Sequence, residues 1–268
     1  MVGLPTDVTG VLVSATEPTA PARGLLEAMD VIVAVEGKEV GEDGTVLFDQ
    51  VTAEHGAPRS LRLKLDWAFR RRAPGDLVQL EVMRRGARAQ ISLPIVRLAP
   101  LTPADPLDGE RLGTRPEYLI VGGLVFVPLT EPYLTDEFGE DWSNCPARLL
   151  YLAQHGLKES CHHQCVVLSD VLACEFTQGY EVFRHHVVER CDGHAVHNLE
   201  HLASLVASCQ GAFLRFDLAQ AKVLALRRAD IGEATAAILR QNQISEPQHI
   251  IARDRGSGCL CARQREKK

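Results

Sequence analysis

The feature of this chain that most limits its fold is a pattern that occurs twice. The segments at 11–14 and 30–40 have counterparts at 166–169 and 186–196. Both counterparts lie about 155 residues further along the chain, and a shared offset of this kind indicates a duplicated domain. We therefore expect two domains, which suits a chain of 268 residues of which 46% are hydrophobic.

The expected elements are short. Apolar runs rich in β-branched residues predict strands, and apolar residues at helical spacing predict helices. In the first copy these are strands at 11–13, 30–35, 77–82 and 89–96, and helices at 23–29 and 60–71. In the second copy they are strands at 118–127, 166–169, 213–218 and 222–226, and helices at 147–157, 199–209 and 231–240.

These elements predict an α+β, β-rich fold in which each copy is a small β-sandwich or barrel capped by helices. A Pro-rich stretch without hydrophobic period separates the copies and is expected to be a linker. The predicted organisation is a first domain at 1–98, a linker at 99–116, a second domain at 117–252 and a disordered tail at 253–268.

Net charge and hydropathy exclude two classes of partner. The formal charge of −6 argues against nucleic acid, and the basic clusters adjoin apolar-periodic segments, as a solvated face does. The longest apolar run, at 119–127, is about half of what a transmembrane helix needs and ends at Pro128, so no membrane span is expected.

Cysteine and histidine side chains raise the question of a metal site. Eight cysteines in a chain of this length, without a signal peptide, are expected to be reduced. Cys161-His162-His163-Gln164-Cys165 offers ligands that zinc prefers, but a second pair of ligands in register is missing. We predict no metal and no other cofactor, and a zinc-binding adaptor stays an alternative.

The first copy resembles the PDZ domain of Deg/HtrA serine proteases. The resemblance rests on Gly10-Val11-Leu12-Val13, Glu17-Pro18-Thr19-Ala20-Pro21, Asp30-Val31-Ile32, Pro74-Gly75-Asp76 and Val82-Met83-Arg84-Arg85-Gly86. In the family, a strand with a carboxylate-binding loop precedes the segment that matches 9–13. Only residues 1–8 stand before it here, so the first PDZ-like domain is expected to be incomplete at its N-terminal end.

The second copy resembles the second PDZ domain of the plant-type Deg branch, known in chloroplast, mitochondrion and nucleus. The matching segments are Tyr118–Phe126, Glu131–Leu134, Gln164–Ser169, Gly179–Glu181 and Asn198-Leu199. The resemblance implies binding of polypeptide segments or C-termini by strand addition, in which an extended peptide pairs with an exposed sheet edge beside a helix. It implies no cofactor, and PDZ contacts between subunits could form a homo-oligomer.

The resemblance also implies which residues bind the peptide. The segment 118–126 is expected to form the open sheet margin, with a Gly loop that lets a ligand approach the backbone and a helix at 199–209 that lines the pocket. The predicted peptide-binding residues are Val121, Gly122, Gly123, Leu124, Val125, Phe126, Leu199, Leu202 and Ala203.

No catalytic residue is predicted. The family's Gly-Asn-Ser-Gly-Gly nucleophile loop is missing, and the Gly-Ser-Gly at 256–258 lies in a polar tail without a base. Two interpretations stay open: a binding module that regulates substrate recognition and assembly without cutting, or a fragment of an active serine endopeptidase whose catalytic domain is encoded upstream. The incomplete first domain favours a fragment.

Overall fold

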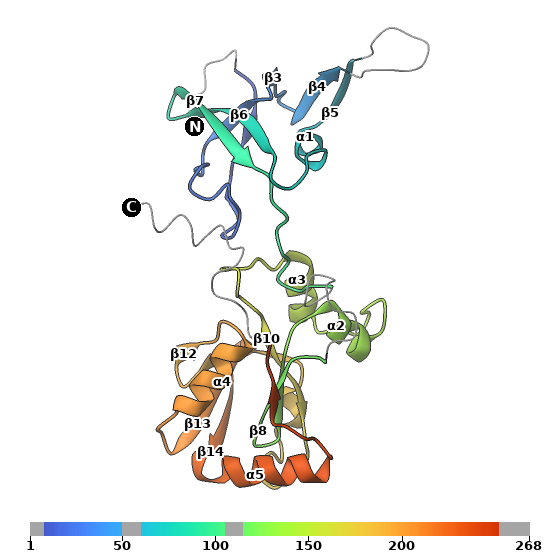
Figure 1. Ribbon diagram of the computed structural model, residues 1–268, viewed down its shortest axis with the longest axis vertical. Helices are drawn as coiled ribbons and strands as arrows, with labels where there is room; N and C mark the ends of the chain where they lie inside the picture. Colours follow the sequence, from blue (N-terminus) through green and yellow to red (C-terminus); the bar gives the residue numbers. More distant parts are fainter. Residues whose placement is uncertain (1–7, 50–59, 105–114, 252–268) are drawn as a thin grey trace. The chain divides into compact units, whose positions relative to one another are not determined.

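The computed structural model describes residues 8–49, 60–104 and 115–251, which form two compact units. One unit extends to Leu98 and the other begins at Ala99. Across these described residues the fold is rich in β-strands and includes five α-helices, so the predicted β-rich fold class is confirmed (Figure 1). Whether the chain contains two PDZ domains stays a prediction.

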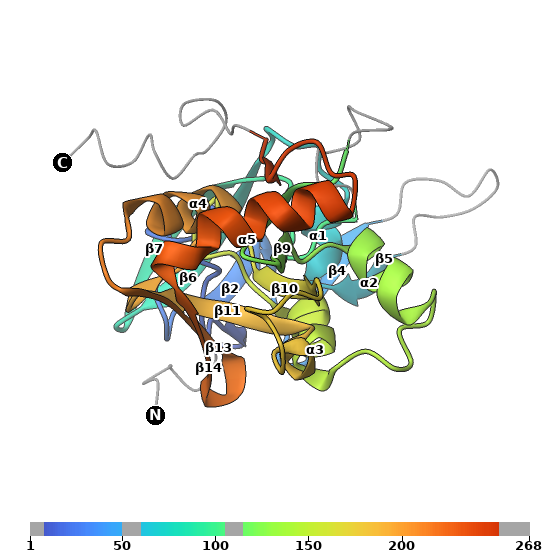
Figure 2. The same cartoon turned by 90° about the horizontal axis from the view of Figure 1, so that it is seen from below.

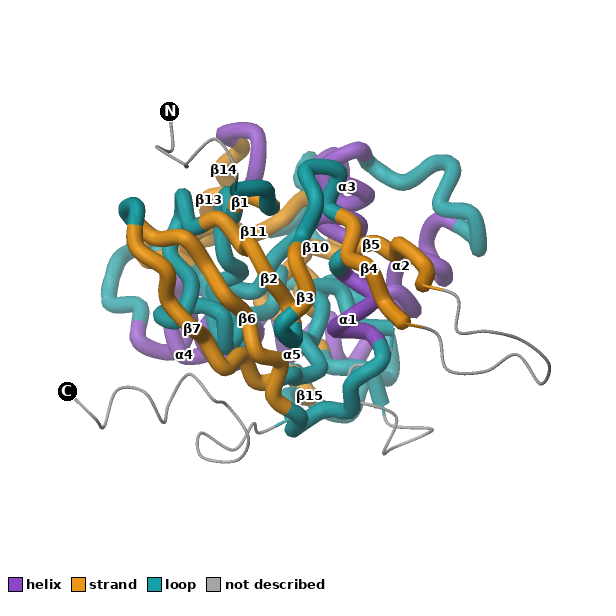
Figure 3. Tube along the Cα trace, turned by 90° about the horizontal axis from the view of Figure 1, so that it is seen from above, coloured by secondary structure: helices purple, strands orange, loops and turns teal. Residues whose placement is uncertain are grey.

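The first unit is built on one antiparallel sheet and a separate hairpin. Its elements are β1 (Val11–Leu12), β2 (Val31–Val35), β3 (Lys38–Glu39), β4 (Thr45–Asp49), β5 (Ser60–Lys64), α1 (Asp66–Arg70), β6 (Leu77–Arg84) and β7 (Ala87–Pro94). The sheet has the order β1-β2-β6-β7 with β3 beside β2, and β4 pairs with β5. Figure 3 shows β2, β6 and β7 side by side. Val35, Val40, Val46 and Val78 are fully buried between these elements.

The helix predicted at 23–29 is wrong, and the helix predicted at 60–71 is wrong in part. Residues 23–29 form turns, because Gly24 and Met29 both have a positive φ, which a right-handed helix excludes. Residues 60–64 form β5, in which Leu61 and Leu63 alternate with charged side chains at the period of a strand. Only the five residues of α1 are helical there.

The second unit is larger and consists of one sheet with α-helices packed against it. Its strands are β8 (Tyr118–Val121), β9 (Leu124–Pro128), β10 (Val166–Val171), β11 (His186–Cys191), β12 (His194–Ala195), β13 (Phe213–Leu218), β14 (Lys222–Arg227) and β15 (Gln248–His249). Its helices are α2 (Glu131–Phe138), α3 (Ala147–His155), α4 (Leu199–Ser208) and α5 (Arg228–Gln241), with short 3₁₀ turns η1 (Glu181–Phe183) and η2 (Ala219–Ala221).

The sheet of the second unit has the order β14-β13-β11-β10-β9-β8-β15, with β12 beside β11. Helix α4 contacts β8, β9 and β11, whereas α5 contacts β14 and β8 and lies across the end of the sheet (Figure 2). The main core lies between the sheet and these helices and includes Phe126 and Phe216, whose ring centroids are 5.0 Å apart. A smaller core joins α2 and α3 to the sheet.

The repeat seen in the sequence reappears as the same strand register in both units. Leu12 lies opposite Val31, and the residues at the corresponding positions, Val167 and Val187, are likewise paired. The β2–β3 turn and the β11–β12 turn also pair equivalent residues, and each is followed in the sheet by a hairpin, β6–β7 or β13–β14.

A bulge occurs at the same place in both copies. The register of β2 against β6 shifts between Ile32 and Ala34, and that of β11 against β13 shifts between Val188 and Arg190. A bulge bends a strand at a fixed position and is conserved when a structure is copied. The two units therefore share a strand path and a local irregularity, which supports duplication.

Other expectations differ in detail. The predicted single strand at 118–127 is the hairpin β8–β9, because Gly122 and Gly123 both have a positive φ and turn the chain. The predicted linker is not all exposed, since Leu101 and Thr102 are buried in the second unit. The predicted disordered tail at 253–268 lies outside the described residues. No helix in the described part of the chain combines the length and the apolar character needed to cross a bilayer.

Candidate functional site

The structure brings the residues of the predicted groove together, but largely as core. Leu199 and Leu202 of α4 are fully buried, and so are Leu124 and Phe126 of β9. All four belong to one hydrophobic cluster with Val121 of β8. Of the nine predicted residues only Val125 and Ala203 are half-buried, so the groove side chains pack against each other.

The position of α4 is fixed by polar contacts at its N-terminus. The Asn198 side chain accepts a hydrogen bond from the His201 backbone N–H at 2.7 Å, which caps the helix. The Gln164 side chain accepts a hydrogen bond from the Leu199 N–H at 3.1 Å and donates one to Glu117 at 3.0 Å. These bonds hold the helix against β8 and β9.

We expected residues 118–126 to form an open sheet margin, and this expectation is wrong, because β8 is paired on both sides. Strand β8 pairs with β9 on one side and with β15 on the other, where Gln248 lies opposite Leu119. The Ile120 N–H donates to the Pro247 carbonyl at 2.7 Å, and the half-buried Ile250 packs against the main core. The edge of β8 is closed because the segment that follows α5 forms β15 and pairs with it.

Weakening β15 should loosen the margin that it covers. Replacing Ile250 by Ser removes apolar surface that is partly buried, which costs about 1–2 kcal/mol. We expect the Ile120 amide to exchange its hydrogen about tenfold faster, because its acceptor, the Pro247 carbonyl, detaches more often. Hydrogen–deuterium exchange measures the effect. The matched control is Gln248→Ser, an exposed side chain of β15, and equal rates in the two variants would contradict the expectation.

The turn Gly122-Gly123 is held by hydrogen bonds to α5 and to the segment after β10. The Gly122 N–H donates to the Thr235 hydroxyl of α5 at 2.8 Å, and the Gly123 carbonyl accepts from the Leu172 N–H at 2.8 Å. A Cβ on Gly123 would lie 3.0 Å from the Leu172 carbonyl oxygen and from the Thr177 methyl group. The Gly122 N–H is therefore committed to α5 rather than aimed at solvent.

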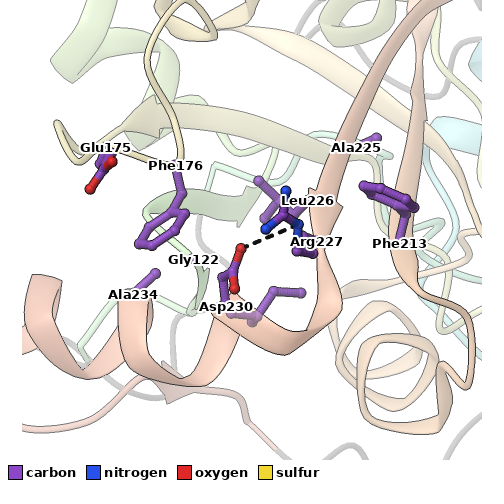
Figure 4. Close-up of a pocket in the computed structure, with 10 residues that line it drawn as sticks. Gly122, Glu175, Phe176, Phe213, Ala225, Leu226, Arg227, Asp230 and Ala234 are labelled. Carbon is purple, nitrogen blue, oxygen red and sulfur yellow. Dashed lines mark ion pairs between the residues drawn. The ribbon is translucent and has the colours of Figure 1, made fainter.

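A pocket of about 390 Å³ opens beside this turn (Figure 4). The β8–β9 turn, the segment after β10, strands β13 and β14 and helix α5 all contribute to it. Its lining residues are Gly122, Glu175, Phe176, Phe213, Ala225, Leu226, Arg227, Asp230, Ile231 and Ala234. Only Gly122 was predicted from the sequence as a binding residue.

An ion pair crosses the pocket. The Arg227 Nε lies 3.7 Å from the Asp230 carboxylate, with Phe176 and Ala234 to one side of the pair and Phe213 to the other (Figure 4). Phe176 and Phe213 are 42% and 58% exposed, which is unusual for large aromatic side chains. The signal that could have indicated them is the scarcity of aromatic residues, 5% of the chain, together with the place of Phe176 between two strands and of Phe213 at the start of one.

The cysteine and histidine motif does not assemble as a metal site. Among the described residues, no three His, Cys, Asp or Glu side chains are placed to hold one ion. The His163 Nδ1 accepts a hydrogen bond from the Glu159 N–H at 3.1 Å. Burial raises the pKa of the Cys165 thiol to about 12, so the free thiol stays protonated at neutral pH.

Comparison with known proteins places these features in a family context. Residues 108–249 match the model of the PDZ domain. The chain is 32% identical over 234 residues to "Protease Do-like 2, chloroplastic" of Arabidopsis thaliana, an alignment that covers 86% of the chain and 35% of that protein. It is 30% identical over 241 residues to "Protease Do-like 4, mitochondrial" of the same plant, with 89% and 40% covered.

A third relative is "Putative protease Do-like 3, mitochondrial", also of Arabidopsis thaliana. It is 28% identical over 240 residues, which cover 88% of the chain and 38% of the relative. The chain thus spans about two fifths or less of the length of these curated relatives.

Proposed function

This chain belongs to the PDZ domain family and corresponds to the PDZ region of Deg/HtrA-type proteases, and we propose that it recognises polypeptide segments. The observation that carries the proposal is the family match at 108–249, because PDZ domains bind extended peptides by strand addition. In a Deg/HtrA protease such recognition would select substrates or neighbouring subunits, and thereby regulate proteolysis and assembly.

We further propose that the chain contains two PDZ-like domains, at 1–98 and 117–252. The support is the equivalent strand pairing of the two units, including the bulges at Ile32 and Val188. The first domain contains no described counterpart of the hairpin β8–β9. The second domain has that hairpin, and we assign the leading role in peptide recognition to it.

The nine residues expected to bind the peptide stay a proposal. Gly122 lines the pocket, and Val125 and Ala203 are half-buried, so a ligand can reach these three without displacing the core. The other six are Val121, Gly123, Leu124, Phe126, Leu199 and Leu202, which a ligand would contact only if β8 or α4 moved.

Peptide selection from a display library tests the proposed function. The full chain is exposed to random dodecapeptides, displayed in one library with a free C-terminus and in another with both ends joined to the carrier. We expect at least one library to yield sequences that share a motif and bind the purified chain. A chain that enriches no sequence from either library, while an unrelated PDZ domain does so in parallel, lacks the proposed function.

A second candidate function is serine proteolysis, favoured by the names of the relatives and by the two fifths or less of their length that the chain spans. In this view a catalytic domain is encoded before Met1. An in-frame Gly-Asn-Ser-Gly-Gly in the genomic sequence upstream would support it, and an in-frame stop codon with no such sequence would remove it. Assembly into a homo-oligomer through PDZ contacts is also a proposal, which light scattering of the purified chain would test.

A further inference from the structure

We propose that the pocket beside Gly122 receives an apolar anchor side chain of an extended peptide that lies along the free edge of β14. The inference rests on the proposed peptide recognition and names the place and the ligand chemistry. The site differs from the predicted groove between 118–126 and α4, which is closed by β15 and by core packing.

The lining of the pocket selects an apolar side chain. Phe176, Leu226 and Ile231 offer carbon surface, and Ala234 adds a small wall on α5. A volume of about 390 Å³ is at the lower end of natural ligand sites and accommodates one aromatic or large aliphatic side chain with part of its backbone. The exposed rings of Phe176 and Phe213 would lose contact with water when such a side chain enters.

The charged groups at the pocket do not favour a free anion. Arg227 is paired with Asp230, and Glu175 adds a further negative charge to the lining. A terminal carboxylate would meet two carboxylates beside one guanidinium that is already paired. An internal peptide segment, which carries no terminal charge, fits this electrostatic environment better.

The neighbouring strand edge indicates that the ligand is a peptide. Arg215 of β13 directs its backbone toward Asp192, since its N–H donates to the Asp192 carboxylate and its carbonyl accepts from the Asp192 N–H, both at 2.8 Å. Ala225 is its partner on β14, so the backbone groups of Ala225 point away from β13. Those of Val223, two residues earlier, point the same way.

These outward backbone groups lie on the outer edge of the sheet, where β14 is the terminal strand. The Ala225 carbonyl accepts a hydrogen bond from the Tyr180 hydroxyl at 2.9 Å, which shows that the edge accepts donors from outside the sheet. Among the described residues, the backbone N–H and carbonyl of Val223 have no hydrogen-bond partner. An added strand would supply one.

Two variants with matched controls, and one variant in the predicted groove, test the site in the full chain. Phe176→Ser removes one apolar wall, and Val182→Ser is its control, because Val182 is 74% exposed in the same connection but does not line the pocket. Val223→Pro removes the outward N–H, and Val223→Thr keeps that N–H with a similar shape. Lys222, with φ −85° and ψ 148°, already has the conformation that a following proline requires. Ala203→Glu alters the predicted groove on α4.

The probe is the dodecapeptide library with both ends joined to the carrier, followed by titration of the enriched peptides. We expect peptides with a shared apolar residue that bind Phe176→Ser and Val223→Pro at least about tenfold more weakly than the original chain. They should bind Val182→Ser and Val223→Thr unchanged. Circular dichroism checks whether each variant folds. If Val223→Pro does not fold, the test rests on the affinity of Phe176→Ser compared with that of Val182→Ser, because Phe176 is exposed and its replacement should not disturb folding.

Two results would overturn the inference and are distinguishable. Enriched peptides that bind Phe176→Ser as tightly as the original chain but lose binding to Ala203→Glu would place the ligand in the predicted groove, and the proposed function would stand. If neither this library nor the one with free C-termini yields a binder, the pocket and the proposed function fail together.

Discussion

Replacing Asp30 by Asn should lower the free energy of unfolding of the first unit by about 2–3 kcal/mol. The Asp30 side chain is 1% exposed and accepts hydrogen bonds from Arg84 Nε at 2.8 Å, from Arg84 Nη2 at 2.6 Å and from the Glu27 N–H at 2.8 Å. Asn has the same shape but no charge, and its amide donors would face the donors of Arg84. Breaking a buried pair costs about 3–5 kcal/mol, and the partial exposure of Arg84 reduces that cost.

The effect should depend on pH in a defined direction. The hydrogen bond from Arg84 is the main cause that holds the pKa of the Asp30 carboxyl below its usual value. The stabilisation is complete above the pKa of an aspartate in the unfolded chain, about 3.9, and is lost as the pH falls through the lower pKa of the folded state. The difference between the original chain and Asp30→Asn should therefore shrink below about pH 4.

Denaturant unfolding, followed by fluorescence, measures this difference. The chain has two tryptophans, and in a Trp142→Phe background Trp67 reports on the first unit alone. Glu81→Gln is the matched control, because Glu81 pairs with Arg88 at 2.6 Å on the surface, where a pair is worth at most about 1 kcal/mol. Equal losses in Asp30→Asn and Glu81→Gln would contradict the special role of the buried pair.

Replacing Gly123 by Ala should destabilise the second unit by about 3 kcal/mol. Gly123 has φ +98°, a conformation that costs an alanine about 1–2 kcal/mol. The new Cβ would also lie 3.0 Å from the Leu172 carbonyl oxygen and 3.3 Å from the Cys174 sulfur. Overpacking of this kind adds about 1–3 kcal/mol.

The variant Gly179→Ala separates the cost of the positive φ from the cost of overpacking. Gly179 has φ +89°, close to that of Gly123, but a Cβ there meets nothing within 4 Å. The free energy of unfolding of Gly179→Ala should fall only by the cost of placing alanine at a positive φ, about 1–2 kcal/mol. Trp142 fluorescence in a Trp67→Phe background reports on the second unit. Unfolding of both alanine variants at the same denaturant concentration would contradict the expected overpacking of a Cβ at Gly123.

Much of the fold was predictable because the repeat and the short-range patterns agree. The helix expected at 199–209 is α4, and the hairpin expected at 213–226 is β13–β14. The prediction at 60–71 failed because three leucines can satisfy a helical and a strand period in so short a segment, and pairing with β4 decides between them. Tertiary context, rather than local propensity, made that choice.

The candidate site was less predictable. Leu199 and Leu202 were expected to line a groove, and the sequence alone cannot distinguish a buried leucine from one that faces a ligand. The pocket combines residues as far apart as Gly122 and Asp230, and no local period connects them. Strand β15 was missed because two residues are too few to give a periodic signal.

Strand β8 is synthesised long before β15, the strand that covers its edge. Leu119 pairs with Gln248, so about 130 residues must be made before this edge of the sheet can close. A chain emerging from the ribosome would expose the edge of β8 until residue 248 has left the exit tunnel, and an unpaired edge invites association with other chains. Shortened versions of the second unit should thus extend at least to Ile251, whose N–H bonds Glu117.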